Sequence, residues 1–334
     1  MRSSITTATA SKRAKASRTE AAAGGPGPRG LLAALALALV VVGCGRSASA
    51  PAALAPSASV RPAQRIVSLA PSITEILYAL DLGARVVGVT SYCDYPPEAA
   101  TKPKVGALLD PNIEAVLSLR PDLVILFATH GAALSALQAL ELPCLTVSGD
   151  TMEQILTSIQ TIATACGCAE RGTELTAALR RRVDAVARKP RSARLPRVLV
   201  SVGRSMGSGR LQEVYVAGED GFFSELIRLA GGCNACPERT IRFPLVSPEG
   251  IQEMNPDVII ELAADLDRLS LTAADVVREW NVVREVSAVR QGRVHVFAED
   301  YVTVPGPRFV LLLEQMAAVI APAPSGQGTA GGTP

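Results

Sequence analysis

Short apolar runs alternate with amphipathic stretches along the first half of the chain. The apolar runs predict strands at 65–69, 85–89, 123–127 and 144–147. The stretches between them have the apolar period of helices, at 71–80, 133–140 and 152–165. This alternation predicts a parallel sheet. Ligands collect at the carboxyl ends of such strands, so we expect a binding site in the loops that begin at 70, 90, 128 and 148.

One helix–turn–strand unit occurs twice, at 112–125 and 247–260. Each copy has a capping residue, a glutamate two places later, a short helix, and a Pro-Asp pair before an apolar strand. The glutamate precedes the proline by seven positions in both copies. Asn112 and Ser247 suit the caps, because a short polar side chain accepts from a free amide of the first turn. We interpret the repeat as one unit used in each of two similar α/β lobes.

The glutamates of the repeat are Glu114 and Glu249. Both fall in the first turn of a predicted helix, where the helix dipole favours a carboxylate. Helix capping is the simplest explanation for either residue alone. Their matched placement in the two halves also indicates paired contacts to a two-fold partner.

A long helix at 170–189 connects the two halves, with its leucines and valines along one side and many arginines elsewhere. A single helical connector predicts only small closing motions. The second half predicts a strand at 197–202, helices at 222–229 and 308–320, and a strand at 293–297. The glycine-rich loop 203–210 lacks both common phosphate-loop patterns, which disfavours a nucleotide-dependent enzyme and favours a flexible loop over a cleft.

Residues 1–44 are typical of a signal peptide. A basic start without early acidic residues precedes an apolar run at 31–42, which is shorter than the about 20 residues that span a bilayer. The run ends in Gly43-Cys44, which resembles a bacterial lipobox, so we predict a lipid anchor on Cys44; the alternative is an ordinary secretory signal.

A flexible linker follows at 45–62, and the Pro/Gly-rich tail 322–334 is expected to be disordered. The mature 291 residues (334 − 43) suffice for lobes at 63–168 and 195–321, joined by a connecting helix at 169–190.

Charge and cysteine usage exclude some classes and leave others open. A net charge of only +2 argues against a nucleic-acid-binding protein, which typically carries an excess of basic residues. The presence of only two histidines argues against a multi-histidine metal site. Sequence alone leaves open how six cysteines pair in an exported protein: Cys93, Cys144, Cys166, Cys168, Cys233 and Cys236. Cys233 and Cys236 form a C-x-x-C motif, which keeps an exported thiol oxidoreductase as a distant alternative.

Three segments carry a family resemblance. They are Arg-Ile-Val-Ser-Leu-Ala-Pro-Ser-Ile-Thr-Glu at 65–75, Ser-Tyr-Cys-Asp-Tyr-Pro-Pro at 91–97, and Leu-Arg-Pro-Asp-Leu-Val-Ile at 119–125. They resemble the solute-binding proteins of bacterial ABC importers, more narrowly the periplasmic cobalamin-binding proteins and their siderophore- and haem-binding relatives. The resemblance implies an α/β fold with two Rossmann-like lobes joined by a single long backbone helix, the class III periplasmic binding protein fold.

The same resemblance implies a non-enzymatic monomer without a cofactor, on the periplasmic face of a bacterial membrane. Its partners would be the permease and ATPase subunits of an importer, with Glu114 and Glu249 docking onto permease arginines. Family members that bind cobalamin line the cleft with aromatic residues, and a few polar residues add contacts. The matching ligand-binding positions here are Ser91, Tyr92, Leu108, Phe127, Val202, Phe243, Asp300 and Arg308.

Cobalamin or a related corrinoid is therefore the expected ligand, because a broad flat ring needs apolar faces and a few polar contacts. Core packing is the alternative role for Tyr92, Phe127 and Phe243. Haem is an alternative ligand, with His130 as an axial ligand to its iron. A ferric siderophore is favoured if three basic residues face the cleft: Arg204, Arg210 and Arg242.

Overall fold

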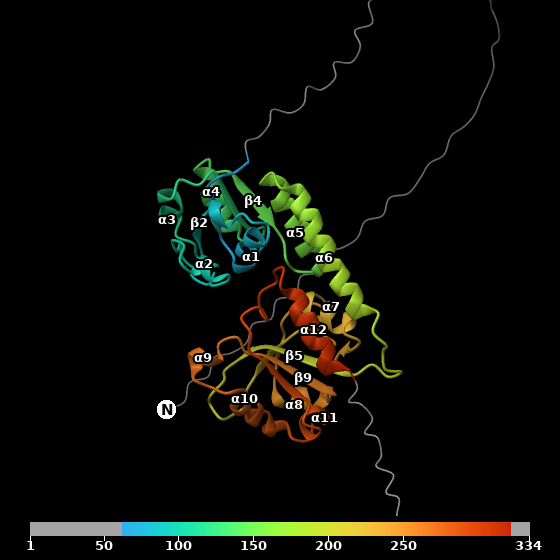
Figure 1. The fold of residues 1–334 in the computed structure, drawn as a ribbon. Helices are drawn as coiled ribbons and strands as arrows, with labels where there is room; N and C mark the ends of the chain where they lie inside the picture. The colour runs from blue at the N-terminus through green and yellow to red at the C-terminus, as the bar shows by residue number, and fades with distance from the viewer. Residues whose placement is uncertain (1–61, 322–334) are drawn as a thin grey trace, which may run out of the picture. The chain divides into compact units, whose positions relative to one another are not determined.

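The computed structural model describes residues 62–321 (Figure 1). The predicted signal segment 1–44 with Cys44, all but the last residue of the linker 45–62, and the tail 322–334 lie outside these residues. No helix within 62–321 combines the length and apolar character that crossing a bilayer requires.

The first sheet has four strands, all parallel, in the order β2-β1-β3-β4. Its strands are β1 (Ile66–Ser68), β2 (Val86–Val89), β3 (Leu123–Phe127) and β4 (Cys144–Val147). The helices of this part are α1 (Pro71–Ala79), α2 (Pro97–Ala100), α3 (Ile113–Ser118), α4 (Gly131–Ala139) and α5 (Met152–Ala165), with a 3₁₀ turn at Gly83–Arg85. The predicted parallel sheet is confirmed, and we call this part the first lobe.

The second sheet is mixed, in the order β10-β9-β5-β6-β8, with β7 pairing β5. Its strands are β5 (Arg197–Arg204), β6 (Val214–Val216), β7 (Cys233–Asn234), β8 (Leu245–Val246), β9 (Val258–Leu262) and β10 (Val294–Phe297). Its helices are α7 (Phe222–Leu229), α8 (Pro248–Met254), α9 (Leu266–Leu269), α10 (Ala273–Glu279), α11 (Ser287–Arg290) and α12 (Phe309–Ile320), with a 3₁₀ turn at Trp280–Val283. Strands β10, β9 and β5 are parallel, while β6 and β8 form an antiparallel edge. We call this part the second lobe.

Helix α6 (Ala169–Ala187) is the predicted connector, and it packs against α5 of the first lobe and α12 of the second (Figure 1). Leu179, Val183 and Val186 form its buried face. They belong to one apolar cluster that also contains residues of both sheets. The connector is therefore held to both lobes by apolar packing along its length.

The repeated unit has the same geometry in both lobes. The Asn112 side chain accepts from the third residue of α3, and Ser247 does the same for α8. The Pro-Asp aspartates have matched roles as well. Asp122 accepts from the backbone amides of the two residues before β1, and Asp257 accepts from the first amide of β5. Each copy thus fixes the strand after its helix beside the first strand of its own lobe.

Candidate functional site

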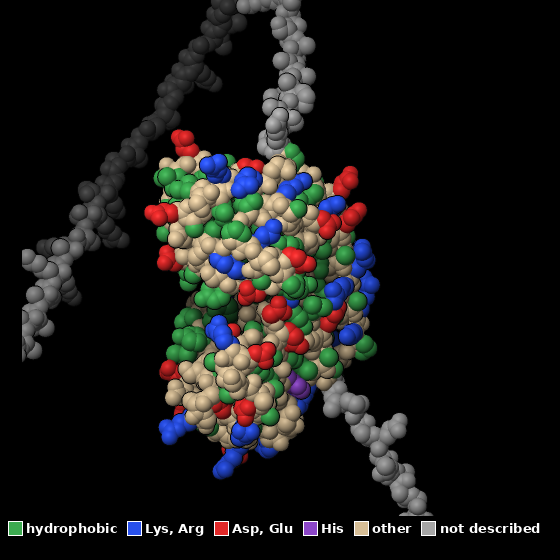
Figure 2. Space-filling model, turned by 60° about the vertical axis from the view of Figure 1, so that its left-hand side comes forward, with side chains coloured by type: hydrophobic (Ala, Val, Ile, Leu, Met, Phe, Trp, Pro, Cys, Tyr) green, Lys and Arg blue, Asp and Glu red, His purple; other side chains and the backbone are tan. Residues whose placement is uncertain are grey.

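Four hollows lie at or beside the boundary between the lobes, and the loop 299–307 between β10 and α12 lines all of them. Thr303 lines three hollows, of about 210, 400 and 380 Å³, and Pro305 lines the first of these and a fourth of about 110 Å³. The first lobe contributes the loops that follow β2, β3 and β4. Figure 2 shows the surface recessed between the lobes, with hydrophobic side chains beside the recess. This position agrees with the carboxyl-end rule for parallel strands.

The structure brings seven of the eight predicted ligand-binding residues to these hollows. The 400 Å³ hollow is lined by Tyr92, Leu108, Asp300 and Arg308. Val202 and Phe243 line the 380 Å³ hollow, and Phe127 lines the 110 Å³ hollow. Ser91 lies outside all four linings, and its hydroxyl donates to the carbonyl of Gly106 at 3.1 Å within the first lobe.

Two of the three aromatic candidates, Tyr92 and Phe243, are presented to solvent rather than packed in the core. Tyr92 is 59% exposed and Phe243 is 41% exposed, so core packing does not describe either residue. Phe127 is partly buried against the main apolar cluster, and its ring contacts the His130 ring in a T-shaped arrangement, with 5.7 Å between the ring centroids. A half-exposed aromatic side chain in a cleft offers an apolar face to a ligand without further rearrangement.

A row of ring contacts positions Phe243. Phe309, which is fully buried, contacts Phe222 at 6.3 Å between ring centroids; Phe222 contacts Phe223 at 5.2 Å, and Phe223 contacts Phe243 at 6.2 Å. All three contacts are edge-on, a favoured geometry for aromatic pairs. The exposed ring of Phe243 is therefore supported from the core of the second lobe. Sequence reasoning missed the Phe222-Phe223 pair, although the two adjacent phenylalanines at a predicted helix start were visible.

Arg308 connects the two lobes at the 400 Å³ hollow. Its guanidinium donates to Glu75 of α1 at 2.6 and 3.0 Å and to Asp300 at 2.8 Å twice. It also lies 3.5 Å from the ring centroid of Tyr95. Burial lowers the pKa of Arg308, but the hydrogen bonds and charges of Glu75 and Asp300 outweigh it and raise that pKa. Arg308 thus remains charged, and its donors are directed to carboxylates of the protein.

Glu75 therefore has a different role from the one that its position predicts. The spacing from Ser72 is typical of a capping box, but α1 begins after Ala70 without any side-chain cap. The carboxylate of Glu75 faces Arg308 of the other lobe, and its side chain is only 3% exposed. The capping box that this spacing predicts is absent, because a long-range ion pair uses the same carboxylate.

Two further polar contacts join the lobes beside α5. Arg242 of the second lobe donates to Asp150, in the loop after β4, at 2.5 Å. Glu225 of α7 accepts from the backbone amide of Met152, at the first turn of α5, at 2.8 Å. The cleft is thus crossed by charged side chains along its length.

Comparison with known proteins places this architecture. The family model described as "Periplasmic binding protein" matches residues 66–301. The chain belongs to the periplasmic binding protein family. It is 30% identical, over 78% of its length and 80% of the relative, to the uncharacterized ABC transporter substrate-binding lipoprotein YvrC of Bacillus subtilis.

Solved structures of such binding proteins have the same fold. The vitamin B12 binding protein BtuF of Vibrio cholerae matches with a TM-score of 0.65 and 27% identity, covering 78% of this chain and 97% of that structure. The haem-binding protein RhuT of Roseiflexus sp. RS-1, in its apo form, matches with a TM-score of 0.66 and 29% identity, covering 77% and 97%. The predicted class III fold is confirmed, and the family is one of substrate-binding transport proteins.

In this periplasmic binding protein, Arg204 does not face the cleft. Its side chain is 1% exposed and pairs with Glu261 at 2.9 Å and Glu279 at 2.5 Å. Glu279 also accepts from the amides of Gly207 and Gly209 at 3.0 and 2.8 Å. The glycine-rich loop is therefore tied to a buried carboxylate, so these amides do not form a phosphate cradle. Arg204 gives no support to the siderophore alternative, whereas Arg242 does reach a hollow.

The cysteines within 62–321 are all free thiols. Cys236 of the C-x-x-C motif is 1% exposed, and burial raises the pKa of its thiol. A reactive thiol needs the opposite shift, toward the thiolate. No group of three or more metal-ligating side chains occurs in this part of the chain. His130 lines none of the four hollows, and burial lowers its pKa.

The paired glutamates of this binding protein occupy equivalent places. Glu114 and Glu249 lie in the first turns of α3 and α8, and both are exposed. Hydrogen bonds from its own backbone amide and from Ser247 lower the pKa of Glu249. Neither glutamate has an ion pair with another described residue. Both carboxylates are therefore accessible to a partner protein, and each lies at the same place in the repeated helix–turn–strand unit.

Proposed function

We propose that this protein is the solute-binding component of an ABC importer and that it captures cobalamin or a related corrinoid between its lobes. The observation that carries the proposal is the cleft with apolar walls on both sides. Tyr92 and Leu108 line the 400 Å³ hollow from the first lobe, and Val202 and Phe243 line the neighbouring 380 Å³ hollow in the second. Such walls suit the two faces of a broad flat ring, with polar groups at the rim. The likeness to a vitamin B12 binding protein supports the same ligand class.

The protein acts by binding and delivery rather than by catalysis. Ligand that contacts both lobes stabilises their closed arrangement through its higher affinity for that arrangement. The single connector α6, packed against both lobes, restricts the motion to small changes of angle. The loaded protein then docks on the permease, which spreads the lobes and releases the ligand.

Glu114 and Glu249 carry the docking in this proposal. Reversing both charges, Glu114→Arg with Glu249→Arg, is expected to leave ligand affinity intact and to abolish transport into cells. Glu253→Arg is the matched control, because Glu253 is exposed on the same helix as Glu249. Loss of ligand binding in the folded double variant, or full transport, would refute the docking assignment.

A lipid on Cys44 holds the protein at the periplasmic face of a membrane in the same proposal, as a monomer. The likeness to a substrate-binding lipoprotein supports this anchor. Mass spectrometry of the protein from membranes is expected to show an acylated N-terminal Cys44. A Cys44→Ala variant should be recovered without lipid; an unmodified wild-type chain would contradict the anchor.

Haem is the second candidate ligand, because a haem-binding protein matches this chain equally well in fold. Calorimetric titration with cyanocobalamin, haem and a ferric hydroxamate siderophore in parallel separates the candidates. We expect one-to-one binding of cyanocobalamin, weakened by Tyr92→Ala and by Phe243→Ala. Binding of haem alone, with a Soret shift that His130→Ala abolishes, would replace the ligand and keep the family. Unchanged affinity in both aromatic variants would place the pocket elsewhere.

A further inference from the structure

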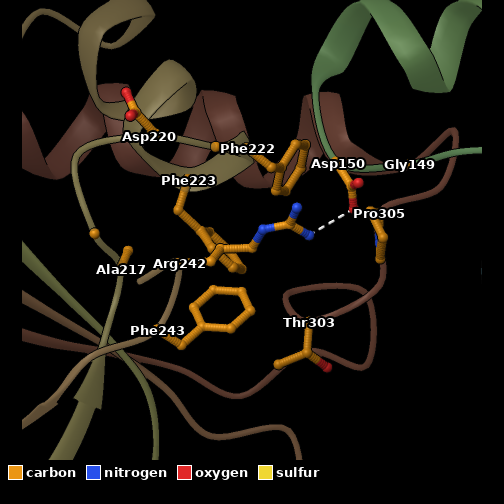
Figure 3. Close-up of a pocket in the computed structure, with 12 residues that line it drawn as sticks. Gly149, Asp150, Ala217, Asp220, Phe222, Phe223, Arg242, Phe243, Thr303 and Pro305 are labelled. Atoms are coloured by element: carbon orange, nitrogen blue, oxygen red, sulfur yellow. Dashed lines mark hydrogen bonds and ion pairs between the residues drawn. The ribbon is translucent and has the colours of Figure 1, made fainter. Parts of the chain in front are cut away.

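Arg242 extends across the 210 Å³ hollow towards the other lobe (Figure 3). It comes from the segment before β8, and its guanidinium reaches Asp150 at 2.5 Å. Figure 3 shows the Arg242 side chain among the rings of Phe222, Phe223 and Phe243. A cation with apolar surfaces beside it is well placed to hold an anionic group on a mainly apolar molecule.

The backbone around Arg242 is fixed, so the side chain starts from a defined position. The carbonyl of Arg242 accepts from the amide of Gly218 at 2.8 Å. A Cβ on Gly218 would lie 2.6 Å from the carbonyl oxygen of Ile241, which shows how closely the two segments pack. Asn234 donates to the carbonyls of Ala217 and Gly218 at 3.1 and 2.7 Å and holds the other side of this junction.

Arg242 differs from the other arginines that line the hollows. Arg308 is 14% exposed and is bonded to two carboxylates, one of which is itself buried. Arg268 is 73% exposed and lies 3.5 Å from Asp265 of its own lobe. The pair of Arg242 with Asp150 crosses the lobes, and its side chains remain 50% and 41% exposed. An ion pair this exposed adds about 0–1 kcal/mol to stability, so another anion can replace Asp150 at little cost.

We propose that Arg242 receives a carboxylate or phosphate group of the ligand and that this group takes the place of Asp150. The apolar body of the ligand then lies against Phe223 and Phe243. Asp150 competes with the ligand anion for Arg242. In the ligand-free protein, Asp150 pairs with the Arg242 guanidinium and links the lobes across the hollow. This inference rests on the proposed function in one respect, since it assumes that the ligand binds in this cleft.

A pair of fluorescent probes tests the site without knowledge of the natural ligand. Anilinonaphthalene sulfonate carries an anionic group on an aromatic body, and N-phenyl-naphthylamine has the same ring system without the anion. We expect Arg242→Gln to weaken binding of the sulfonate by about tenfold or more, as loss of a charge-assisted hydrogen bond does. Binding of the neutral amine should change little. Arg239→Gln is the matched control, because Arg239 is exposed on the same segment and lines none of the hollows.

Asp150→Asn reverses the expected effect. It removes the competing carboxylate, so sulfonate binding should become several-fold tighter. Arg242→Lys should restore part of the affinity that Arg242→Gln loses. Equal sulfonate binding in wild type and Arg242→Gln, an equal loss for the amine, or weaker sulfonate binding in Asp150→Asn would each overturn the proposal. Urea midpoints of the variants equal to that of wild type show that the fold is retained.

Matched tetrapyrroles identify the anion and separate this inference from the proposed function. Haemin and its dimethyl ester differ in their carboxylates, while cyanocobalamin and dicyanocobinamide differ in the phosphate-bearing nucleotide loop. Arg242→Gln should weaken only the member of a pair that carries the anion. Tetrapyrrole binding that is insensitive to Arg242→Gln would refute this site and leave the function standing. Absence of tetrapyrrole binding with the predicted probe behaviour would refute the function and leave the anion site standing.

Discussion

The ion pair between Arg308 and Glu75 allows a sharp test of how the two lobes are held together. The two residues are 233 positions apart in the sequence, and their side chains are 14% and 3% exposed. Replacing Arg308 by glutamine leaves the buried Glu75 carboxylate without its cation. Asp300, whose side chain is 59% exposed, can recover water instead. The cost of the substitution therefore arises mainly at Glu75.

Removal of one partner from a buried ion pair costs about 3–5 kcal/mol, because an uncompensated charge stays buried. We expect Arg308→Gln to lower the free energy of unfolding by that amount. The double variant Glu75→Gln/Arg308→Gln should lose less than Arg308→Gln alone, because no buried charge remains unpaired. Arg182→Gln is the control: Arg182 pairs with Glu314 between α6 and α12, but those side chains are 44% and 40% exposed. Its loss should be about 0–1 kcal/mol.

Urea unfolding followed by far-ultraviolet circular dichroism and by tryptophan fluorescence measures these differences. Trp280 is the single tryptophan of the chain and is fully buried in the second lobe. Fluorescence therefore reports on that lobe, while circular dichroism reports on the whole chain. Coincident transitions justify a single free energy of unfolding. A loss in Arg308→Gln no larger than that in Arg182→Gln, or a double variant as unstable as the sum of its single changes, would refute this reasoning.

Three further predictions concern buried groups. Burial opposes ionisation of Glu279, but hydrogen bonds from Arg204 and two loop amides lower its pKa below 4.5. Its stabilisation is therefore complete above pH 4.5 and lost as pH falls through the lowered pKa, so Glu279→Gln should flatten the loss of stability in acid urea titrations. Gly218→Ala should cost about 1–3 kcal/mol, measured by urea unfolding, because its Cβ would overlap the carbonyl of Ile241. Cys236→Ser should leave the labelling rate by an aromatic disulfide reagent unchanged at neutral pH, because the buried thiol has a raised pKa.

Much of the framework follows from local signals that sequence carries. Strand β4 and helices α5 and α7 have the predicted bounds, because apolar period and capping residues specify them within a few positions. The repeated unit was visible for the same reason: its cap, proline and aspartate act within one turn or at the next strand. Strands β6 and β8 were missed. They have three and two residues, respectively, and owe their form to pairing at the edge of the sheet rather than to propensity.

The candidate cleft was predictable only in outline. Seven of the eight residues predicted from strand ends and family resemblance lie around the hollows. This part was predictable because the order of strands and helices determines which loops lie at the carboxyl edge of the sheet. The ion-pair partners of the charged side chains were not predictable from the sequence. Arg204 belongs to a buried network with Glu261 and Glu279, which lie 57 and 75 positions further along the chain. The spacing of Glu75 from Ser72 predicts a cap of its own helix, whereas the partner of Glu75 is Arg308 of the other lobe. Such pairings depend on tertiary packing, which no local spacing encodes.

The two arginine–carboxylate pairs between the lobes suit opposite tasks, and their burial decides which. Glu75 and Arg308 are largely buried, so separating them would leave a buried charge without its partner. A ligand contact does not readily offset that cost. Asp150 and Arg242 keep about half of their surface in solvent, so water and dissolved ions already compete with that bond. A pair that must persist through capture and release belongs with the first kind, and a pair that must open for a ligand belongs with the second. Raising the salt concentration should therefore weaken the Arg242 contact well before it affects the Arg308 contact, which is the order that reversible ligand capture requires.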